Sequence, residues 1–212
     1  MKVLKQLFDN NIRWAEVRNQ QDPHFFQKLS EQHSPKYLWI GCSDSRVPAN
    51  EIVGLDPGEL FVHRNVGNIV LHTDLNCLSV LQYAIDILKV EHIIICGHYG
   101  CGGIQAAMCK HQLGLIDNWL RGVKDIYRKN QAQLDAIPDD KQRMDMLCEM
   151  NIAEQVYNVS HTTIVQAAWQ RGQSLAIHGW VYRIQDGRLH DLDLCVTAME
   201  QIESIYRIKC HK

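Results

Sequence analysis

The 212-residue sequence lacks any long apolar segment. No apolar run approaches the roughly 18 residues that a membrane-spanning helix needs. The first residues, Met1 to Leu4, lead directly into polar ones and are not followed by the apolar core of a signal peptide. We therefore expect the chain to stay in the cytoplasm.

The sequence also lacks an excess of charge of either sign. Its 22 lysines and arginines balance 24 aspartates and glutamates, for a formal net charge of −2, so the sequence does not indicate a nucleic-acid-binding surface. It contains no internal repeat, low-complexity tract or linker. At this length, with 46% hydrophobic residues, we expect residues 1–212 to form a single domain with a substantial core.

A disulfide framework is not indicated, although the chain has eight cysteines. Without an export signal they are expected to be thiols. Two stray pairs of metal-ligand types, Cys109-x-His111 and Cys210-His211, fall in or just past a predicted helix and at the end of the chain. We interpret both pairs as structural or exposed residues.

Residues 93–108 predict a strand, a loop and a helix in succession. Four residues typical of a buried strand, Ile93 to Cys96, are followed by the glycine-rich residues 97–103 and a helical pattern over 104–108. In parallel α/β sheets, ligands bind beyond the carboxyl ends of the strands, which is where His98 and Cys101 fall. On a turn that glycine permits, these two side chains can chelate one zinc ion.

A second segment repeats this pattern and supplies a third ligand. Residues 37–41 form an apolar, strand-like run that ends at a glycine and is followed by Cys42. If the two strands are parallel neighbours, Cys42 lies beside His98 and Cys101. Alternate residues of an extended segment share a face, so Asp44 and Arg46 can point into the same crevice. The sequence predicts zinc ligation by Cys42, His98 and Cys101, with Asp44 as a conditional fourth ligand.

Each of these residues has a plain structural alternative. A single Cys or His after a strand is typically a packed core residue, and Asp44 with Arg46 alone would be a surface salt bridge. The combination of three ligand types at matching strand ends favours a metal site. Zinc fingers and ribbons repeat paired ligands at short spacing and close the fourth position with protein. The present set has three protein ligands and only a conditional fourth, and a fourth position that can open favours a catalytic zinc site.

The remaining elements are predicted from hydrophobic periodicity and turn residues. The predicted helices are residues 4–32 in two pieces, with Pro23 opening the second, 75–89 after an Asp74 cap, 115–133 and 152–171. Residues 139–143 are predicted as a turn or surface loop. The predicted strands are 60–62, 175–184 and 189–196, the last two joined in a hairpin by an Asp186-Gly187 turn.

The two predicted ligand segments resemble the signature of a known enzyme family. Cys42-Ser43-Asp44-Ser45-Arg46 together with His98-x-x-Cys101-Gly102-Gly103 is similar to the motifs of the β-class carbonic anhydrases, and the similarity extends over nearly the whole chain. The resemblance implies a single α/β domain with a mainly parallel β-sheet flanked by helices, one zinc ion per chain, and assembly as a homodimer or homotetramer. It also implies that residues 1–34 form a helical arm that packs on a partner subunit. From pattern alone, an arm that covers its own core is an equal alternative.

The implied activity is that of a lyase, carbonate dehydratase, which reversibly hydrates carbon dioxide to bicarbonate and a proton. In this family, zinc-bound hydroxide attacks carbon dioxide. Zinc held by two thiolates and one imidazole is a weaker Lewis acid than zinc held by three imidazoles. We therefore expect help from an Asp44–Arg46 dyad, in which the ionised Asp44 accepts a hydrogen bond from that hydroxide.

The resemblance extends to substrate-binding positions. Phe61, Val66 and Tyr83 match residues that line the family's apolar substrate pocket near the dimer interface, and plain core packing is the alternative for each. The amides of Gly102 and Gly103 open a predicted helix, where an anionic product such as bicarbonate is favoured.

Three further residues match a regulatory site. Trp39, Arg64 and Tyr182 correspond to a non-catalytic bicarbonate site in a bacterial-type subgroup of the family. In that subgroup, bicarbonate favours a closed state in which Asp44 leaves Arg46 and becomes the fourth zinc ligand. The alternative for Trp39 is a core tryptophan.

Two other functions are compatible with the same residues. One is a zinc-dependent bicarbonate sensor that turns over slowly, against which the intact Asp44 and Arg46 argue. The other is hydrolysis of carbon disulfide, which the ligands alone do not exclude. Residue 67 is a glycine where the family pattern has alanine, and we expect this position not to contact a metal ligand.

Overall fold

The computed structural model describes residues 3–31 and 34–209. The chain divides into two compact units, residues 1–34 and 35–212. The first unit contains helices α1 (Lys5–Gln21) and α2 (Phe25–Glu31), which confirms the two helices predicted between residues 4 and 32. Trp14 packs edge-on against Phe26 with 5.5 Å between ring centroids, and this contact joins the two helices. No helix of the described residues is long and apolar enough to cross a membrane.

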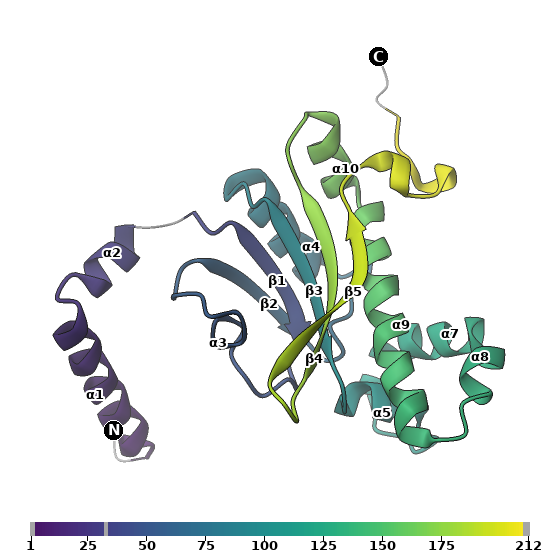
Figure 1. Cartoon of the computed structure of the whole chain (residues 1–212), viewed down its shortest axis with the longest axis horizontal. Helices are drawn as coiled ribbons and strands as arrows, with labels where there is room; N and C mark the ends of the chain where they lie inside the picture. The colour runs from purple at the N-terminus through teal and green to yellow at the C-terminus, as the bar shows by residue number, and fades with distance from the viewer. Residues whose placement is uncertain (1–2, 32–33, 210–212) are drawn as a thin grey trace. The chain divides into compact units, whose positions relative to one another are not determined.

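The second unit is built on one five-stranded sheet, drawn at the centre of Figure 1. Its strands, in the order β2-β1-β3-β4-β5, are β2 (Leu60–Asn65), β1 (Tyr37–Cys42), β3 (His92–His98), β4 (Ala176–Arg183) and β5 (Arg188–Val196). The first three junctions are parallel, and β4 and β5 form an antiparallel hairpin. The expected α/β fold with a mainly parallel sheet and a C-terminal hairpin is therefore confirmed.

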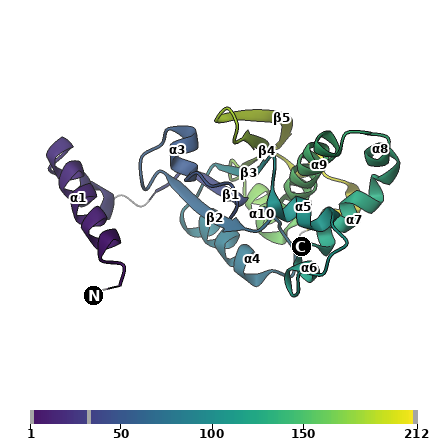
Figure 2. The same cartoon turned by 90° about the horizontal axis from the view of Figure 1, so that it is seen from below.

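Alternation along the strands separates two apolar layers. Leu38 and Ile40 of β1 belong to the large core under helices α4 (Leu75–Gln82), α9 (Asp140–His161) and α10 (Thr163–Gln170). Trp39 lies in a second cluster, which includes Ala49 of α3 (Ala49–Val53). Figure 2 shows α3 and α4 on opposite sides of the sheet.

Helix α9 packs closely on the sheet because two strand residues have no side chain. A Cβ atom at Gly97 of β3 would lie 2.8 Å from the side chain of Ile152, and one at Gly179 of β4 would lie 3.2 Å from it. Ile152 is fully buried. These contacts place α9 directly against β3, the middle strand of the sheet, and its neighbour β4.

The predicted break before α9 is wrong. Residues 140–143, expected in a turn or loop, form the first turn of the helix, because Asp139 caps it by accepting the Gln142 N–H at 2.8 Å. The predicted helix 152–171 is in turn two helices. Thr162 has an extended backbone, ends α9 and caps α10 through its side chain.

Three more predicted elements have different bounds. The helix expected over 115–133 is broken into α6 (Ile116–Trp119), α7 (Arg121–Lys129) and α8 (Gln131–Asp135), because Leu120 and Asn130 leave helical geometry. The helix expected over 75–89 is an α-helix only as far as Gln82, the end of α4. It continues as a π-helical turn, η1 (Tyr83–Ile87). The strand predicted at 60–62 extends to Asn65. The short elements α5 (Gly102–Met108), η2 (Met199–Gln201) and η3 (Ser204–Tyr206) complete the fold.

Candidate active site

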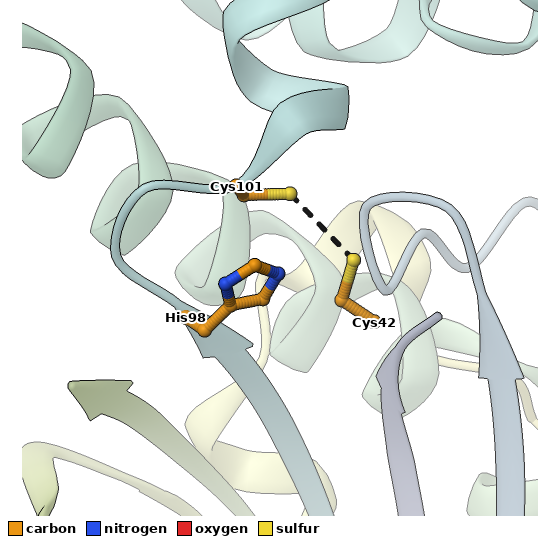
Figure 3. A group of neighbouring side chains, drawn as sticks. All are labelled: Cys42, His98 and Cys101. Atoms are coloured by element: carbon orange, nitrogen blue, oxygen red, sulfur yellow. Dashed lines mark hydrogen bonds between the residues drawn. The ribbon is translucent and has the colours of Figure 1, made fainter. Parts of the chain in front are cut away.

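The structure brings Cys42, His98 and Cys101 together at the carboxyl edge of the sheet. Cys42 is the last residue of β1 and His98 the last of β3, and these strands are parallel neighbours. Cys101 immediately precedes α5. One ligand atom from each residue lies within 4.8 Å of the others, and all three residues are buried. Figure 3 shows the three side chains converging from these separate segments.

The donor atoms of this cluster fit a zinc ion. Nδ1 of His98 lies 3.2 Å from the main-chain oxygen of Tyr99, which can only accept, so Nδ1 carries the proton and Nε2 keeps a lone pair. Nε2 is buried without a hydrogen-bond partner among residues 3–31 and 34–209. The two sulfurs lie 3.6 Å apart. Two sulfurs and one unpartnered imidazole nitrogen form a typical zinc-ligand set.

The two sulfurs have different surroundings. Sγ of Cys42 accepts main-chain N–H groups from Gly67 at 3.3 Å and from Asp44 at 3.4 Å. The hydrogen bond with Cys101, the His98 side chain and these two amides lower the pKa of Cys42 to about 4. The same pairing, together with burial, raises the pKa of Cys101. The pairing therefore favours ionisation of Cys42 over that of Cys101.

Gly67 contacts a predicted metal ligand, contrary to our expectation from the sequence. Its φ of +84° lies in the left-handed region that favours glycine. This conformation turns the Gly67 N–H toward the Cys42 sulfur. Gly67, which replaces the family's alanine, therefore contacts a candidate metal ligand directly.

Asp44 lies outside the ligand cluster and is held by two groups. Its Oδ2 accepts the Gly102 N–H at 2.9 Å, and its Oδ1 lies 3.6 Å from Nη2 of Arg46. The Gly102 amide predicted to hold an anionic product is thus engaged by the Asp44 carboxylate. Gly103 is buried, and a Cβ atom there would lie 2.9 Å from Cγ1 of Val66.

Arg64 holds the loop that carries Asp44. Its Nε and Nη2 donate to the main-chain oxygen of Cys42 at 2.9 and 2.7 Å, and its Nη1 donates to that of Val47 at 3.1 Å. Trp39 and Tyr182 are buried in one cluster, and Val47 packs against it. The three residues expected to bind regulatory bicarbonate therefore all lie around one loop.

The three residues predicted to line the substrate pocket, Phe61, Val66 and Tyr83, pack in two different parts of the domain. Phe61 and Tyr83 pair with 5.9 Å between ring centroids, and Phe61 packs against the large core between sheet and helices. Val66 instead packs against the cluster that contains Cys42 and Cys101. Of the three, Val66 is thus the one that packs against the cluster containing two of the candidate ligands.

The described residues contain one other group of metal-ligand types, His63, Asp74 and Cys77. Asp74 caps α4, and its Oδ1 accepts the Cys77 N–H at 3.3 Å. The Asn65 amide, held by two hydrogen bonds to Ile69, presents its N–H to Nε2 of His63 at 3.3 Å. Because Nε2 of His63 and the Asp74 carboxylate already have partners, we assign the group to capping and packing of α4.

The cysteines outside the site are thiols in the described part of the chain. Cys77, Cys96, Cys109, Cys148 and Cys195 are all free. Cys109 is exposed just past the end of α5. The Cys210-His211 pair lies outside the described residues.

Sequence reasoning missed two side chains that position the site. Nε1 of Trp119 donates to the main-chain oxygen of Val66 at 2.7 Å, and Nδ2 of the buried Asn151 donates to that of Gly67 at 2.9 Å. Trp119 belongs to an apolar helical stripe, which signals packing only. No sequence signal indicates the role of Asn151.

Comparisons with known sequences agree with this site. The family model described as carbonic anhydrase matches residues 37–189. A carbonic anhydrase from Emericella nidulans is 46% identical over 204 residues, which cover 96% of this chain and 90% of that protein. A carbonic anhydrase from Pseudomonas aeruginosa is 34% identical over 196 residues, covering 90% of this chain and 88% of the relative.

Solved structures show the same fold. The β-carbonic anhydrase of Coccomyxa, solved in complex with acetazolamide, has a TM-score of 0.89 and 40% identity, covering 94% of this chain and 90% of that chain. A structure from work on two tetrameric β-carbonic anhydrases of Sordaria macrospora has a TM-score of 0.87 and 37% identity, covering 93% of this chain and 100% of the other.

Proposed function

Since this chain belongs to the β-class carbonic anhydrase family, whose members hydrate carbon dioxide, we propose that Cys42, His98 and Cys101 hold one catalytic zinc ion per chain. The observation that carries this proposal is the unpartnered, buried Nε2 of His98 beside two cysteine sulfurs. Zinc bound there would supply the Lewis acidity that activates a water molecule for attack on carbon dioxide.

Asp44 orients the attacking water in this proposal. Its main-chain N–H donates to the Cys42 sulfur, so Asp44 lies next to the ligand cluster. The Gly102 N–H donates to one oxygen of the Asp44 carboxylate, and Nη2 of Arg46 lies 3.6 Å from the other. An ionised Asp44 can only accept hydrogen bonds, and it therefore directs a lone pair of the water toward the substrate.

Stopped-flow hydration of carbon dioxide by protein of known zinc content tests the function. We expect the rate to follow zinc content and to vanish when a chelator removes the metal. A zinc-loaded protein that binds bicarbonate without hydration activity would instead be a sensor. Hydrolysis of carbon disulfide, without carbon dioxide hydration, would assign the second alternative.

We also propose that the arm joins subunits into a homodimer or homotetramer. Leu7, Phe8 and Ile12 of α1 are each more than half exposed, and such an apolar stripe favours a protein partner. A Sordaria macrospora relative is tetrameric. Light scattering should give a smaller assembly when residues 1–34 are deleted. An unchanged assembly would show that other surfaces join the subunits.

A regulatory role for bicarbonate is the finer part of the proposal. Arg64 donates to the main-chain oxygens of Cys42 and Val47, which lie on either side of Asp44 in the chain. An anion bound to this guanidinium would compete with both carbonyl groups and release the loop. Trp39 and Tyr182 would complete the site, as in the bacterial-type subgroup. The cytoplasmic location stays a prediction.

A further inference from the structure

One peptide group connects a tryptophan to the proposed metal ligand Cys42. The oxygen of Val66 accepts the indole N–H of Trp119 at 2.7 Å, and the N–H of the same peptide, which belongs to Gly67, donates to Sγ of Cys42 at 3.3 Å. Because the peptide is trans, its oxygen and its N–H point in opposite directions. The indole, the peptide and the sulfur therefore form a continuous chain of hydrogen bonds.

The geometry of this chain is held from both sides. Asn151, which is 1% exposed, donates to the oxygen of Gly67 at 2.9 Å. Trp119 packs against the core cluster that includes Cys42. The Gly67 N–H therefore has little freedom to turn away from the sulfur.

Hydrogen bonds in such a chain strengthen one another. A donor on the peptide oxygen polarises the amide and makes its N–H a better donor, and the effect is larger in a buried site than in water. A hydrogen bond to a thiolate withdraws electron density from the sulfur, so the sulfur donates less to a metal. Partners of metal ligands tune metal sites in this way.

We propose that Trp119 is a positioning residue that tunes the metal site through the Val66–Gly67 peptide. It aims the Gly67 N–H at Cys42 and, by polarising the peptide, limits the electron donation from this thiolate. The zinc is then a stronger Lewis acid than two free thiolates would allow. This inference rests on the proposed zinc site at Cys42, His98 and Cys101.

Trp119→Phe tests the proposal, because it keeps an aromatic ring and removes the donor. In cobalt-substituted protein, we expect the thiolate-to-cobalt charge-transfer band to move to lower energy, because the sulfur becomes more electron-rich. In zinc protein, we expect one zinc per chain and kcat for carbon dioxide hydration lowered about tenfold, at the lower end of the effect of losing such a partner, with little change in KM.

Trp169→Phe is the matched control. The Trp169 indole also donates to a main-chain oxygen, that of Leu175 at 2.9 Å, and its removal should leave the band and kcat unchanged. Trp119→Met, which removes the same donor but fills the space with a flexible side chain, should reproduce the band shift of Trp119→Phe.

The outcomes separate this proposal from the proposed function. A parental band position in both Trp119 variants would overturn the tuning role and leave the zinc site standing. Loss of cobalt from both variants, with retention in Trp169→Phe, would also overturn it and give Trp119 a purely structural role. Absence of a thiolate-to-cobalt band in the parent protein would overturn the zinc site itself.

Discussion

The main-chain N–H of Gly102 donates to Oδ2 of Asp44 at 2.9 Å, which joins the loop after β1 to the start of α5. Arg46 lies 3.6 Å from the other carboxylate oxygen. One hydrogen bond and one longer ion-pair contact therefore hold the carboxylate of a residue whose main-chain N–H donates to Sγ of Cys42. This arrangement explains how a charged side chain can keep one orientation although it is partly exposed.

Asp44→Asn should keep the zinc and lower the hydration rate about 10- to 100-fold, the usual effect of losing a group that orients a metal site. An amide cannot supply an ionised acceptor, and its NH2 group would face Arg46. Stopped-flow rates normalised to zinc content measure the effect. Asp86→Asn, which changes the distant ion pair with Arg171, is the control. A nearly parental rate in Asp44→Asn would mean that the pair is only structural.

Cys42→Ala and His98→Ala should each remove zinc and activity together, because two remaining protein ligands bind zinc weakly. Elemental analysis of purified protein should fall from one zinc per chain to almost none. Cys109→Ala removes an exposed thiol outside the cluster and should retain full zinc. Full zinc content in both ligand variants would contradict the assignment.

Trp39→Phe should weaken inhibition by bicarbonate while zinc stays bound. Losing one hydrogen-bond donor of about 0.5–1.5 kcal/mol corresponds to a roughly 2- to 10-fold higher bicarbonate concentration for half inhibition. Hydration rates over a bicarbonate series measure this shift, with Trp169→Phe as the control for loss of an indole. Inhibition equal to that of the parent would mean that this pocket is not regulatory.

Gly97→Ala should lower the free energy of unfolding by about 1–3 kcal/mol, because the new methyl group would overlap the side chain of Ile152. Adding Ile152→Val should recover part of the loss, since the two side chains share one space. Urea unfolding at fixed zinc concentration measures both. Gly122→Ala, with its nearest atom 3.9 Å away, should be neutral or stabilising. Strict additivity of Gly97→Ala and Ile152→Val would contradict the predicted overlap.

The free energy of unfolding should fall as the pH is lowered through about 6.5. Burial lowers the pKa of His63, His161 and His178, so below their ordinary pKa the unfolded chain binds more protons than the folded one. Stability contributed by the neutral histidines is therefore present above this range and lost below it. Urea unfolding at pH 7.5 and 5.5 measures the difference.

His178→Gln should reduce that pH dependence, because one buried titrating group is removed. Nε2 of His178 lies 3.1 Å from Nδ1 of His92. The charge of a protonated His92 further lowers the pKa of His178. Comparing parent and variant cancels the contribution of the metal site. An unchanged difference between the two pH values would show that other groups dominate.

The proximity of Cys42, His98 and Cys101 was predictable because its signal is local. An apolar run that stops at a glycine marks a strand end, and metal-ligand residues follow at Cys42, His98 and Cys101. Parallel neighbouring strands then bring their carboxyl ends to one edge of the sheet. Only the pairing of β1 with β3 had to be assumed, and the structure has it.

Helix boundaries were less predictable because capping competes with periodicity. Asp139 starts α9 within a charged stretch that was expected to be a loop, and Thr162 divides an apolar pattern that continues on both sides of it. Each cap depends on the φ and ψ angles of one residue. Hydrophobic spacing carries no information about those angles.

The sequence by itself was enough to place the three candidate zinc ligands after the apolar runs of two strands, since this depends on residue type and short-range pattern. Only the tertiary structure decided which groups surround them. The Gly102 N–H reaches Asp44 across 58 residues of chain, and Trp119 reaches Val66 across 53. In these contacts at least one partner is a main-chain group, which every residue carries. Their pairing depends on the path of each loop in space, and that path follows from the packing of the whole domain.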